Sequence, residues 1–274
     1  MANAIYHGET QMDLGIKGKR ALVLGSSKGL GYATAHTLAG EGVDVAVSSS
    51  SLERATEAAG TIAADTGAKV VPLLGDVSNP DNMNTLAAEA EAALGGIDIL
   101  VNNHGGPPLG FAVDVKDADL VEQFDKMVRS VIRITSLVLP GMIERKWGRI
   151  VTISSAGNRE PLDNMVLSNT LRGAIVNYTK TLATEVAKHN VTANIASPGS
   201  ILTDRTRSSV ATTAKRRGIS EEEVMAERVK SIPAGRLGDP KEFAAMTAFL
   251  CSEPAGYCTG ALYLADGGRT RSIV

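Results

Sequence analysis

Short apolar runs alternate along the chain with longer segments in which apolar residues recur every three or four positions. Several short runs, such as 21–24 and 99–101, are continuously apolar and do not alternate with polar residues. Strands that are buried on both faces have this pattern, and they form parallel sheets covered by helices. The pattern predicts strands at residues 20–24, 43–48, 69–74, 97–102, 149–154, 190–196 and 261–264.

The longer segments have the periodicity of amphipathic helices. They predict helices at residues 29–41, 51–65, 80–94, 117–145, 164–189 and 240–252. The last of these begins with Pro240, a residue favoured in the first helical turn. Because strands and helices alternate from one end to the other, we expect an α/β fold. It is a single-domain, doubly wound, Rossmann-like parallel sheet with helices on both faces, spanning residues 1–274.

Residues 200–233 interrupt this alternation. The segment is polar and charged, and it is long for a connection inside a compact domain. It leaves from the carboxyl end of a predicted strand, which is the side on which α/β sheets bind ligands. We therefore expect a substrate lid at 200–233, and the alternative is a solvated helical excursion without a role.

Composition and charge narrow the class of protein. The 274 residues are 43% hydrophobic and 21% charged, which suffices for a core without disulfides or structural metal. A net charge of −2 argues against a nucleic-acid partner. The longest uncharged runs, 99–113 and 189–203, are too short to span a membrane, and residues 1–17 do not resemble a signal peptide. Cys251 and Cys258 suggest neither a metal site nor a disulfide framework, so we expect a cytoplasmic protein.

The first predicted strand leads directly into the sequence Gly-Ser-Ser-Lys-Gly-Leu-Gly at 25–31, and a predicted helix follows. Gly25 permits a sharp turn, and Gly29 and Gly31 permit close approach of the backbone. The start of the helix offers unpaired N–H groups and the positive end of its dipole. The turn therefore predicts a dinucleotide phosphate site, and the alternative is a tight strand-to-helix turn without a ligand.

The end of the second predicted strand concerns the choice of dinucleotide. It reads Val-Ser-Ser-Ser-Ser at 47–51, without the carboxylate that an NAD site offers to the ribose hydroxyls. The hydroxyls of Ser50 and Ser51 suit a 2′-phosphate, and Lys28 or Arg54 would neutralise it. This favours NADP, with NAD as the other possibility. Alternatively, the serines only end a strand and cap the next helix.

The spacing of the glycine turn resembles that of the short-chain dehydrogenase/reductase family, and four further motifs follow in the family's order. They are Asp76-Val77, Asn102-Asn103-His104-Gly105, Pro198-Gly199-Ser200-Ile201-Leu202-Thr203 and Asp266-Gly267-Gly268. The resemblance covers roughly residues 15–268. It implies an NAD(P)-dependent oxidoreductase that acts on a carbonyl or alcohol, and a homo-oligomer, commonly a tetramer formed through two long helices.

The resembling family has an active site of Asn, Ser, Tyr and Lys, with the last two spaced Y-x-x-x-K. None of the five tyrosines here has a lysine four residues later. Matching the helix around Tyr178 to the family places Ser168 at the Tyr position and Arg172 at the Lys position, on one helix face. Ser155 falls at the position of the catalytic Ser, and Met127 falls where the Asn belongs. The predicted catalytic residues are therefore Ser155, Ser168 and Arg172.

These substitutions change the expected chemistry. A serine hydroxyl is a far weaker acid than a phenol, which titrates near 10, and arginine stays charged. We expect an NADP-dependent oxidoreductase with a non-standard proton donor. Two alternatives stay open: a non-redox enzyme, such as an isomerase or lyase, on the same scaffold, and a catalytically inactive dinucleotide-binding homologue.

Other polar residues are candidates for a substitute proton donor or for substrate binding. His104 has a side chain suited to proton transfer, although hydrogen bonding or packing is the alternative. Arg159, Glu160 and Asp163 lie in a loop that should border the substrate, and a solvated loop is the alternative. The predicted cofactor contacts are Gly25, Ser27, Lys28, Gly29, Leu30, Gly31, Ser50, Asp76, Val77, Asn103, His104, Gly105, Arg172, Pro198, Gly199, Ile201 and Thr203.

Overall fold

The structure is a computed structural model that describes residues 12–273. Residues 1–11, most of the stretch considered for a signal peptide, lie outside the described part. Within residues 12–273, seven strands form one parallel sheet in the order β3-β2-β1-β4-β5-β6-β7. The strands are β1 (Arg20–Val23), β2 (Asp44–Ser49), β3 (Val70–Leu74), β4 (Ile99–Asn102), β5 (Gly148–Ile153), β6 (Val191–Pro198) and β7 (Leu262–Ala265).

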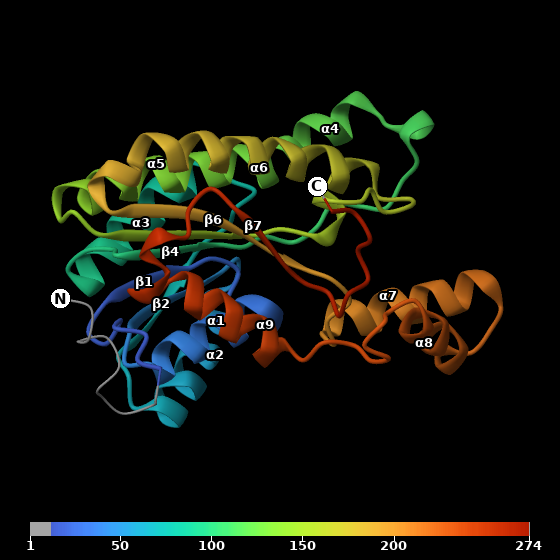
Figure 1. Ribbon diagram of the computed structural model, residues 1–274, viewed down its shortest axis with the longest axis horizontal. Helices are drawn as coiled ribbons and strands as arrows, with labels where there is room; N and C mark the ends of the chain where they lie inside the picture. Colours follow the sequence, from blue (N-terminus) through green and yellow to red (C-terminus); the bar gives the residue numbers. More distant parts are fainter. Residues whose placement is uncertain (1–11, 274) are drawn as a thin grey trace, which may run out of the picture.

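Helices cover both faces of this sheet, with α1, α2 and α9 on one face and α3, α5 and α6 on the other (Figure 1). The helices are α1 (Gly29–Gly40), α2 (Leu52–Thr66), α3 (Pro80–Leu94), α4 (Asp117–Phe124), α5 (Ser130–Glu144), α6 (Val166–Val186), α7 (Asp204–Arg217), α8 (Glu221–Lys230) and α9 (Pro240–Leu250). The predicted doubly wound α/β fold is therefore confirmed. In the described part of the chain, no helix combines the length and the apolar character needed to cross a membrane.

The predicted helix at 117–145 differs from the structure in one respect. A π-helical turn at Asp125–Arg129 separates α4 from α5. Such a turn inserts one residue per turn into the helical ladder but keeps an apolar face, so the apolar periodicity does not reveal it. Met127 lies in this turn and is completely buried.

The sheet is sandwiched between two aliphatic cores. In β1, Leu22 faces one core and Val23 faces the other, and both are fully buried. This alternation follows from the two-residue period of a strand. It explains why the central strands read as continuous apolar runs: each face of the sheet is covered.

The segment predicted as a lid forms α7 and α8, which extend away from the sheet (Figure 1). The two helices bury a small core of their own, made by Val210, Ala214 and Val224. The segment also enters and leaves at one place. Leu202 N–H donates to Gly238 O at 2.9 Å, and Gly238 N–H donates to Ser200 O at 3.0 Å.

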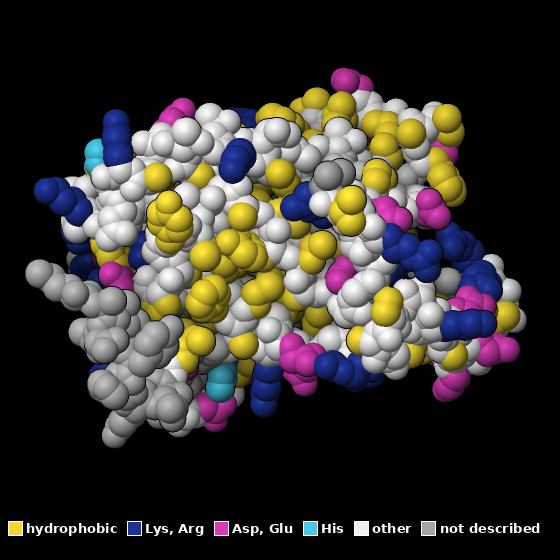
Figure 2. All heavy atoms as spheres, in the orientation of Figure 1, with side chains coloured by type: hydrophobic (Ala, Val, Ile, Leu, Met, Phe, Trp, Pro, Cys, Tyr) yellow, Lys and Arg dark blue, Asp and Glu magenta, His cyan; other side chains and the backbone are white. Residues whose placement is uncertain are grey.

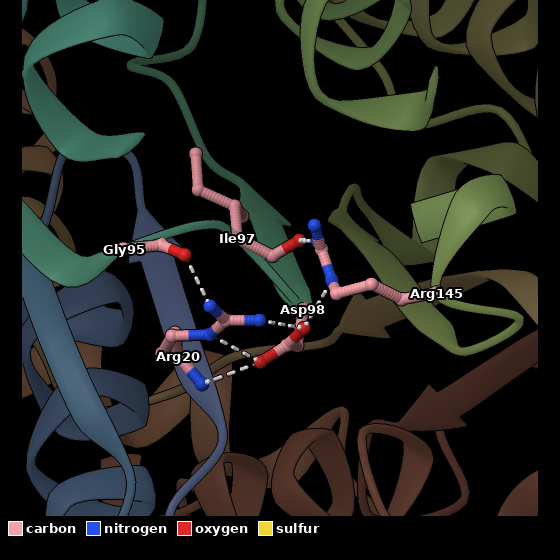
Figure 3. A network of polar contacts seen from close by, with 5 residues as sticks. All are labelled: Arg20, Gly95, Ile97, Asp98 and Arg145. Atoms are coloured by element: carbon pink, nitrogen blue, oxygen red, sulfur yellow. Dashed lines mark hydrogen bonds and ion pairs between the residues drawn. The ribbon is translucent and has the colours of Figure 1, made fainter. Parts of the chain in front are cut away.

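A partly buried ion-pair network joins the beginnings of β1 and β4 to the ends of α3 and α5 (Figure 3). Asp98, 5% exposed, precedes β4 and accepts hydrogen bonds from Arg20 Nε and Nη2, both at 2.7 Å, and from Arg145 Nε at 3.0 Å. Arg20 also donates to Gly95 O, and Arg145 donates to Ile97 O. Burial alone would raise the pKa of Asp98, but the two guanidinium groups outweigh it and lower that pKa.

We expect Asp98→Asn to lower the free energy of unfolding by roughly 3 kcal/mol, because two arginines lose their anion. This is the lower end of the range for a broken buried pair, since both arginines are partly exposed. The pKa of Asp98 is lower in the folded state. Its contribution is therefore present above the unfolded pKa, about 4, and is lost as the pH falls through the folded pKa.

Urea unfolding from pH 7 to pH 3 measures both effects. The matched control is Glu122→Gln, which breaks an exposed pair with Lys126 one helical turn away. We expect that variant to stay within about 0.5 kcal/mol of the wild type. An Asp98→Asn loss no larger than the control, or one that does not shrink in acid, would contradict the role given to this network.

Candidate functional site

The carboxyl ends of the strands meet at the edge of the sheet opposite Asp98. In a parallel sheet the loops that follow neighbouring strands lie together at this edge. The loops after β1, β4, β5 and β6 carry most of the predicted site residues. The structure therefore brings together segments that are up to about 180 residues apart in the sequence.

The turn between β1 and α1 is closed by a contact that only glycine permits. Gly25 and Gly29 have φ of +54° and +63°. A Cβ at Gly31 would lie 2.4 Å from Gly25 O and 2.8 Å from Asn103 Nδ2. Asn103 Nδ2 donates to Gly25 O at 3.0 Å, which fastens the loop after β4 to this turn.

The first turn of α1 is open to an anion. Lys28 is the N-cap residue, and its side chain makes no capping hydrogen bond. The first turn contains no acidic residue. The N–H groups of Gly29, Leu30 and Gly31 therefore lack a side-chain cap, and the helix dipole adds positive potential. The chemistry of the turn fits the pyrophosphate of a dinucleotide.

The four serines at the end of β2 have different surroundings. Ser51 caps α2 by accepting from Arg54 N–H at 3.3 Å, as the alternative interpretation expects. Ser50 instead accepts from Arg54 Nη2 at 3.3 Å and is exposed. Ser27 Oγ and Ser49 Oγ are 3.2 Å apart, which connects this strand end to the glycine turn. Ser50 and Arg54 thus form a polar pair beside the turn.

Two further predicted segments have mainly local partners. The Asp76 carboxylate accepts from Ser78 N–H at 2.9 Å, and Val77 packs against the core on the α3 side. After β6, a Cβ at Gly199 would lie 2.5 Å from Asp266 Cβ, so the two closing turns of the sheet touch. Pro198 ends β6, Ile201 is buried, and Thr203 caps α7.

Ser168 and Arg172 lie one turn apart on α6 and are 3% and 8% exposed. Arg172 Nε donates to Ser168 Oγ at 3.2 Å, and Nη1 donates to Ile153 O at 3.3 Å. Burial, and then the positive charge of Arg205, lower the pKa of Arg172 to about 10. Arg172 is thus a charged group at neutral pH, and it has no carboxylate partner within residues 12–273.

Ser155 follows β5, close to the carbonyl that Arg172 contacts. Its hydroxyl oxygen accepts from Gly157 N–H at 3.1 Å and so caps a short helical turn. The neighbouring Ser154 donates to Asn158 Oδ1 at 2.5 Å. The start of α6 packs against this turn. Ser155 and Ser168 are therefore held by the same packed unit.

His104 is half-buried in the loop after β4. Because a carbonyl only accepts, the 2.9 Å contact with Gly105 O places the ring proton on Nδ1. Burial lowers the pKa of His104 to about 3, assisted by the positive charges of Arg172 and Arg205. The imidazole is therefore neutral at physiological pH, and Nε2 is left as an acceptor.

The loop after β5 holds three charged residues for which the sequence left two roles open, bordering the substrate or facing solvent. Arg159, Glu160 and Asp163 are exposed. Glu160 Oε2 accepts from Arg271 N–H at 3.2 Å, so the carboxyl-terminal segment crosses to this loop (Figure 1). In the described part of the chain, no group of three or more His, Cys, Asp or Glu side chains is placed to hold a metal ion.

Arg205 is a further candidate site residue, which the sequence analysis counted only among the charges of the segment predicted as a lid. The structure places its guanidinium against the loop after β4, where a Cβ at Gly106 would lie 2.1 Å from Nη2 and 2.6 Å from Nη1. Its place two residues after Thr203 was the sole sequence signal. The contact joins positions about 100 residues apart, which no local pattern predicts.

The chain is similar in sequence and in structure to known reductases. The family model described as enoyl-(acyl carrier protein) reductase matches residues 25–270. The 3-oxoacyl-[acyl-carrier-protein] reductase FabG of Aquifex aeolicus is 34% identical, over 94% of this chain and 99% of its own length. The NADPH-dependent reductase BacG of Bacillus subtilis is 32% identical, over 93% and 99%. The crystal structure of L-sorbose reductase from Gluconobacter frateurii, complexed with NADPH and L-sorbose, superposes with a TM-score of 0.91 and 32% identity, over 96% and 100%.

We expect His104 to stay neutral with its proton on Nδ1 between pH 8 and pH 5. Heteronuclear NMR of the ring nitrogens measures this directly. Arg205→Met should raise the pKa of His104, because one of the two nearby positive charges is removed. Since the pKa is lower in the folded state, protonation of the unfolded chain reduces stability as the pH falls below about 6.5. A midpoint between pH 5 and pH 8 in the wild type would disprove this electrostatic picture.

Proposed function

Because this chain belongs to the short-chain dehydrogenase/reductase family, we propose that it is an NADPH-dependent reductase of a small-molecule carbonyl compound. The observation that carries the proposal is the glycine-closed turn between β1 and α1, with its uncapped helix start. The names of the relatives, which include 3-oxoacyl and sorbose reductases, support carbonyl reduction in particular.

In this proposal the cofactor lies along the carboxyl edge of the sheet. The turn from Gly25 to Gly31 holds the pyrophosphate, and Ser50 with Arg54 holds the 2′-phosphate. The loops after β3, β4 and β6 provide the other predicted contacts, from Asp76, Asn103 and Pro198 onward. When bound, NADPH supplies the hydride. The matched helix position places Arg172 at the nicotinamide ribose, whose hydroxyls its guanidinium would bind.

We propose Ser155 and Ser168 as the groups that polarise the substrate carbonyl. Ser168 Oγ accepts from Arg172, and Ser155 Oγ accepts from Gly157 N–H, so the proton of each hydroxyl is left to donate. Fixed donors aimed at the oxygen stabilise the negative charge that develops as hydride arrives. In the proposed active site they take the place of the tyrosine phenol in the family's usual set.

Arg172 adds a charge next to these donors. It is buried, so water screens its field weakly, and its bond to Ser168 transmits the charge to the reacting oxygen. The alkoxide that forms takes its proton from a water molecule, and the hydroxide left behind is neutralised by the buffered solvent. A strong protein acid is therefore not required in this mechanism, and neutral His104 is a hydrogen-bonding residue.

The proposal also includes a substrate lid and a homo-oligomer. The α7–α8 segment, residues 200–233, acts as the substrate lid of one domain, which is supported by its departure from the carboxyl end of β6. The protein forms a homo-oligomer. Exposed apolar side chains on the α4–α5 stretch, Val121, Phe124 and Leu137, support an assembly through these helices.

We expect calorimetric titration to give micromolar or tighter binding of NADPH and weaker binding of NADH. Arg54→Met should weaken NADPH binding by roughly 10-fold, the scale of one charge-assisted hydrogen bond, and leave NADH unchanged. Equal effects on the two nucleotides would argue against the 2′-phosphate site. If neither nucleotide binds, the reductase proposal fails.

We expect Ser168→Ala to lower kcat for carbonyl reduction on the order of 10²-fold, as for loss of one oxyanion donor, while the Kd of NADPH stays the same. Steady-state kinetics on a panel of carbonyl compounds provides the measurement. Ser154→Ala is the matched control, because it removes a hydroxyl from the same region that is bonded to Asn158. Unchanged kcat in Ser168→Ala would remove Ser168 from the mechanism.

The wild-type protein also distinguishes the alternative functions. Turnover without net oxidation of the cofactor would favour an isomerase or lyase, and binding of the cofactor without any turnover would favour an inactive homologue.

A further inference from the structure

Two arginines at the site have no anionic partner among residues 12–273. Arg172 is buried below the end of β5, and Arg205 reaches from α7 to Gly106 in the loop after β4. Their charges are close enough for Arg205 to lower the pKa of Arg172 and for both to lower that of His104. Figure 2 shows Lys and Arg side chains over the protruding α7–α8 pair, with Asp and Glu side chains among them. The site therefore holds two positive charges that no ion pair in the described part of the chain neutralises.

This arrangement is costly without a ligand. A buried charge without a partner is destabilising, and a second like charge nearby adds repulsion. The Arg205 side chain is exposed, and its guanidinium occupies the space that a Cβ at Gly106 would fill. A planar guanidinium with free donors binds a carboxylate in a bidentate manner. We therefore expect a ligand that brings an anionic group to these two arginines.

The position of Gly106 indicates that the anion belongs to the substrate and not to the cofactor. The pyrophosphate fits the turn at Gly25–Gly31, whereas Gly106 lies beyond Gly105, the last cofactor contact predicted in its loop. Arg172 Nε is 3.2 Å from Ser168 Oγ, one of the groups proposed to bind the reacting carbonyl. An anion held between the two arginines is thus close to that carbonyl.

We propose that the substrate is a short oxo acid whose carboxylate is bound by Arg205, in the field of Arg172. This inference rests on the proposed reductase function and specifies its substrate class. The carboxylate would neutralise the excess positive charge and orient the carbonyl towards Ser155 and Ser168. It would also draw α7 towards the loop after β4, because Arg205 belongs to the lid.

The test compares acids with their neutral esters at saturating NADPH, using pyruvate against methyl pyruvate and acetoacetate against methyl acetoacetate. We expect the wild type to prefer the acid in kcat/KM. Arg205→Met should lower kcat/KM for the acid by roughly 10- to 100-fold, the scale of a hydrogen bond to a charged group, with little effect on the ester. The Kd of NADPH, measured by calorimetry, should not change.

Two matched controls separate this site from general charge and general packing. Arg207→Met removes the same charge from an exposed position of α7, and it should retain the preference for the acid. Gly106→Ala should reproduce the loss, because the new Cβ displaces the Arg205 guanidinium. Gly110→Ala in the same loop meets nothing within 4 Å and should behave like the wild type.

The outcomes separate this inference from the function on which it rests. Equal kcat/KM for acid and ester in the wild type overturns the inference but leaves the reductase function. A weaker NADPH Kd in Arg205→Met with an unchanged acid preference assigns Arg205 to the cofactor and also overturns it. If no carbonyl compound is reduced, titration with oxamate and with ethyl oxamate decides. Selective binding of oxamate that Arg205→Met abolishes supports the anion site alone, and equal binding or none refutes it.

Discussion

Every strand of a parallel sheet begins at one edge and ends at the other, and this constraint organises the whole molecule. The β1–β4 pair at the centre of the sheet is fastened at both edges by polar side chains. At the beginning, Arg20 binds Asp98, and at the end, Gly25 accepts from Asn103. Both contacts join the same two strands, five residues apart on each. These two contacts and the β1–β4 pairing between them hold the glycine turn and the loop after β4 side by side.

The apolar pattern predicted the fold because each strand is buried on both faces and each helix on one. The same reasoning could not identify the π-helical turn around Met127, since it leaves the apolar face intact. The motifs predicted which loops meet at the site. They could not predict that Arg205 lies against Gly106, or that His104 is neutral, because both depend on contacts between segments distant in sequence.

The position of Ser168 has a physical consequence for the proposed chemistry. A phenol can supply a proton, whereas a serine hydroxyl can supply only a hydrogen bond. In the proposed mechanism, stabilisation of the developing oxyanion by Ser155, Ser168 and Arg172 replaces proton transfer. The same positive field suits a substrate that brings its own negative charge. Catalysis and substrate choice would then both depend on the positive charges of Arg172 and Arg205.

The closed base of the α7–α8 segment has a consequence for how this protein can change over evolutionary time. Its two ends meet at Ser200–Leu202 and Gly238, and its helices bury their own core. We expect an insertion or deletion between these ends to leave the register of β6 and β7 unaltered. A segment joined to the sheet in this way can be exchanged by recombination while the sheet and the glycine turn between β1 and α1 are inherited intact.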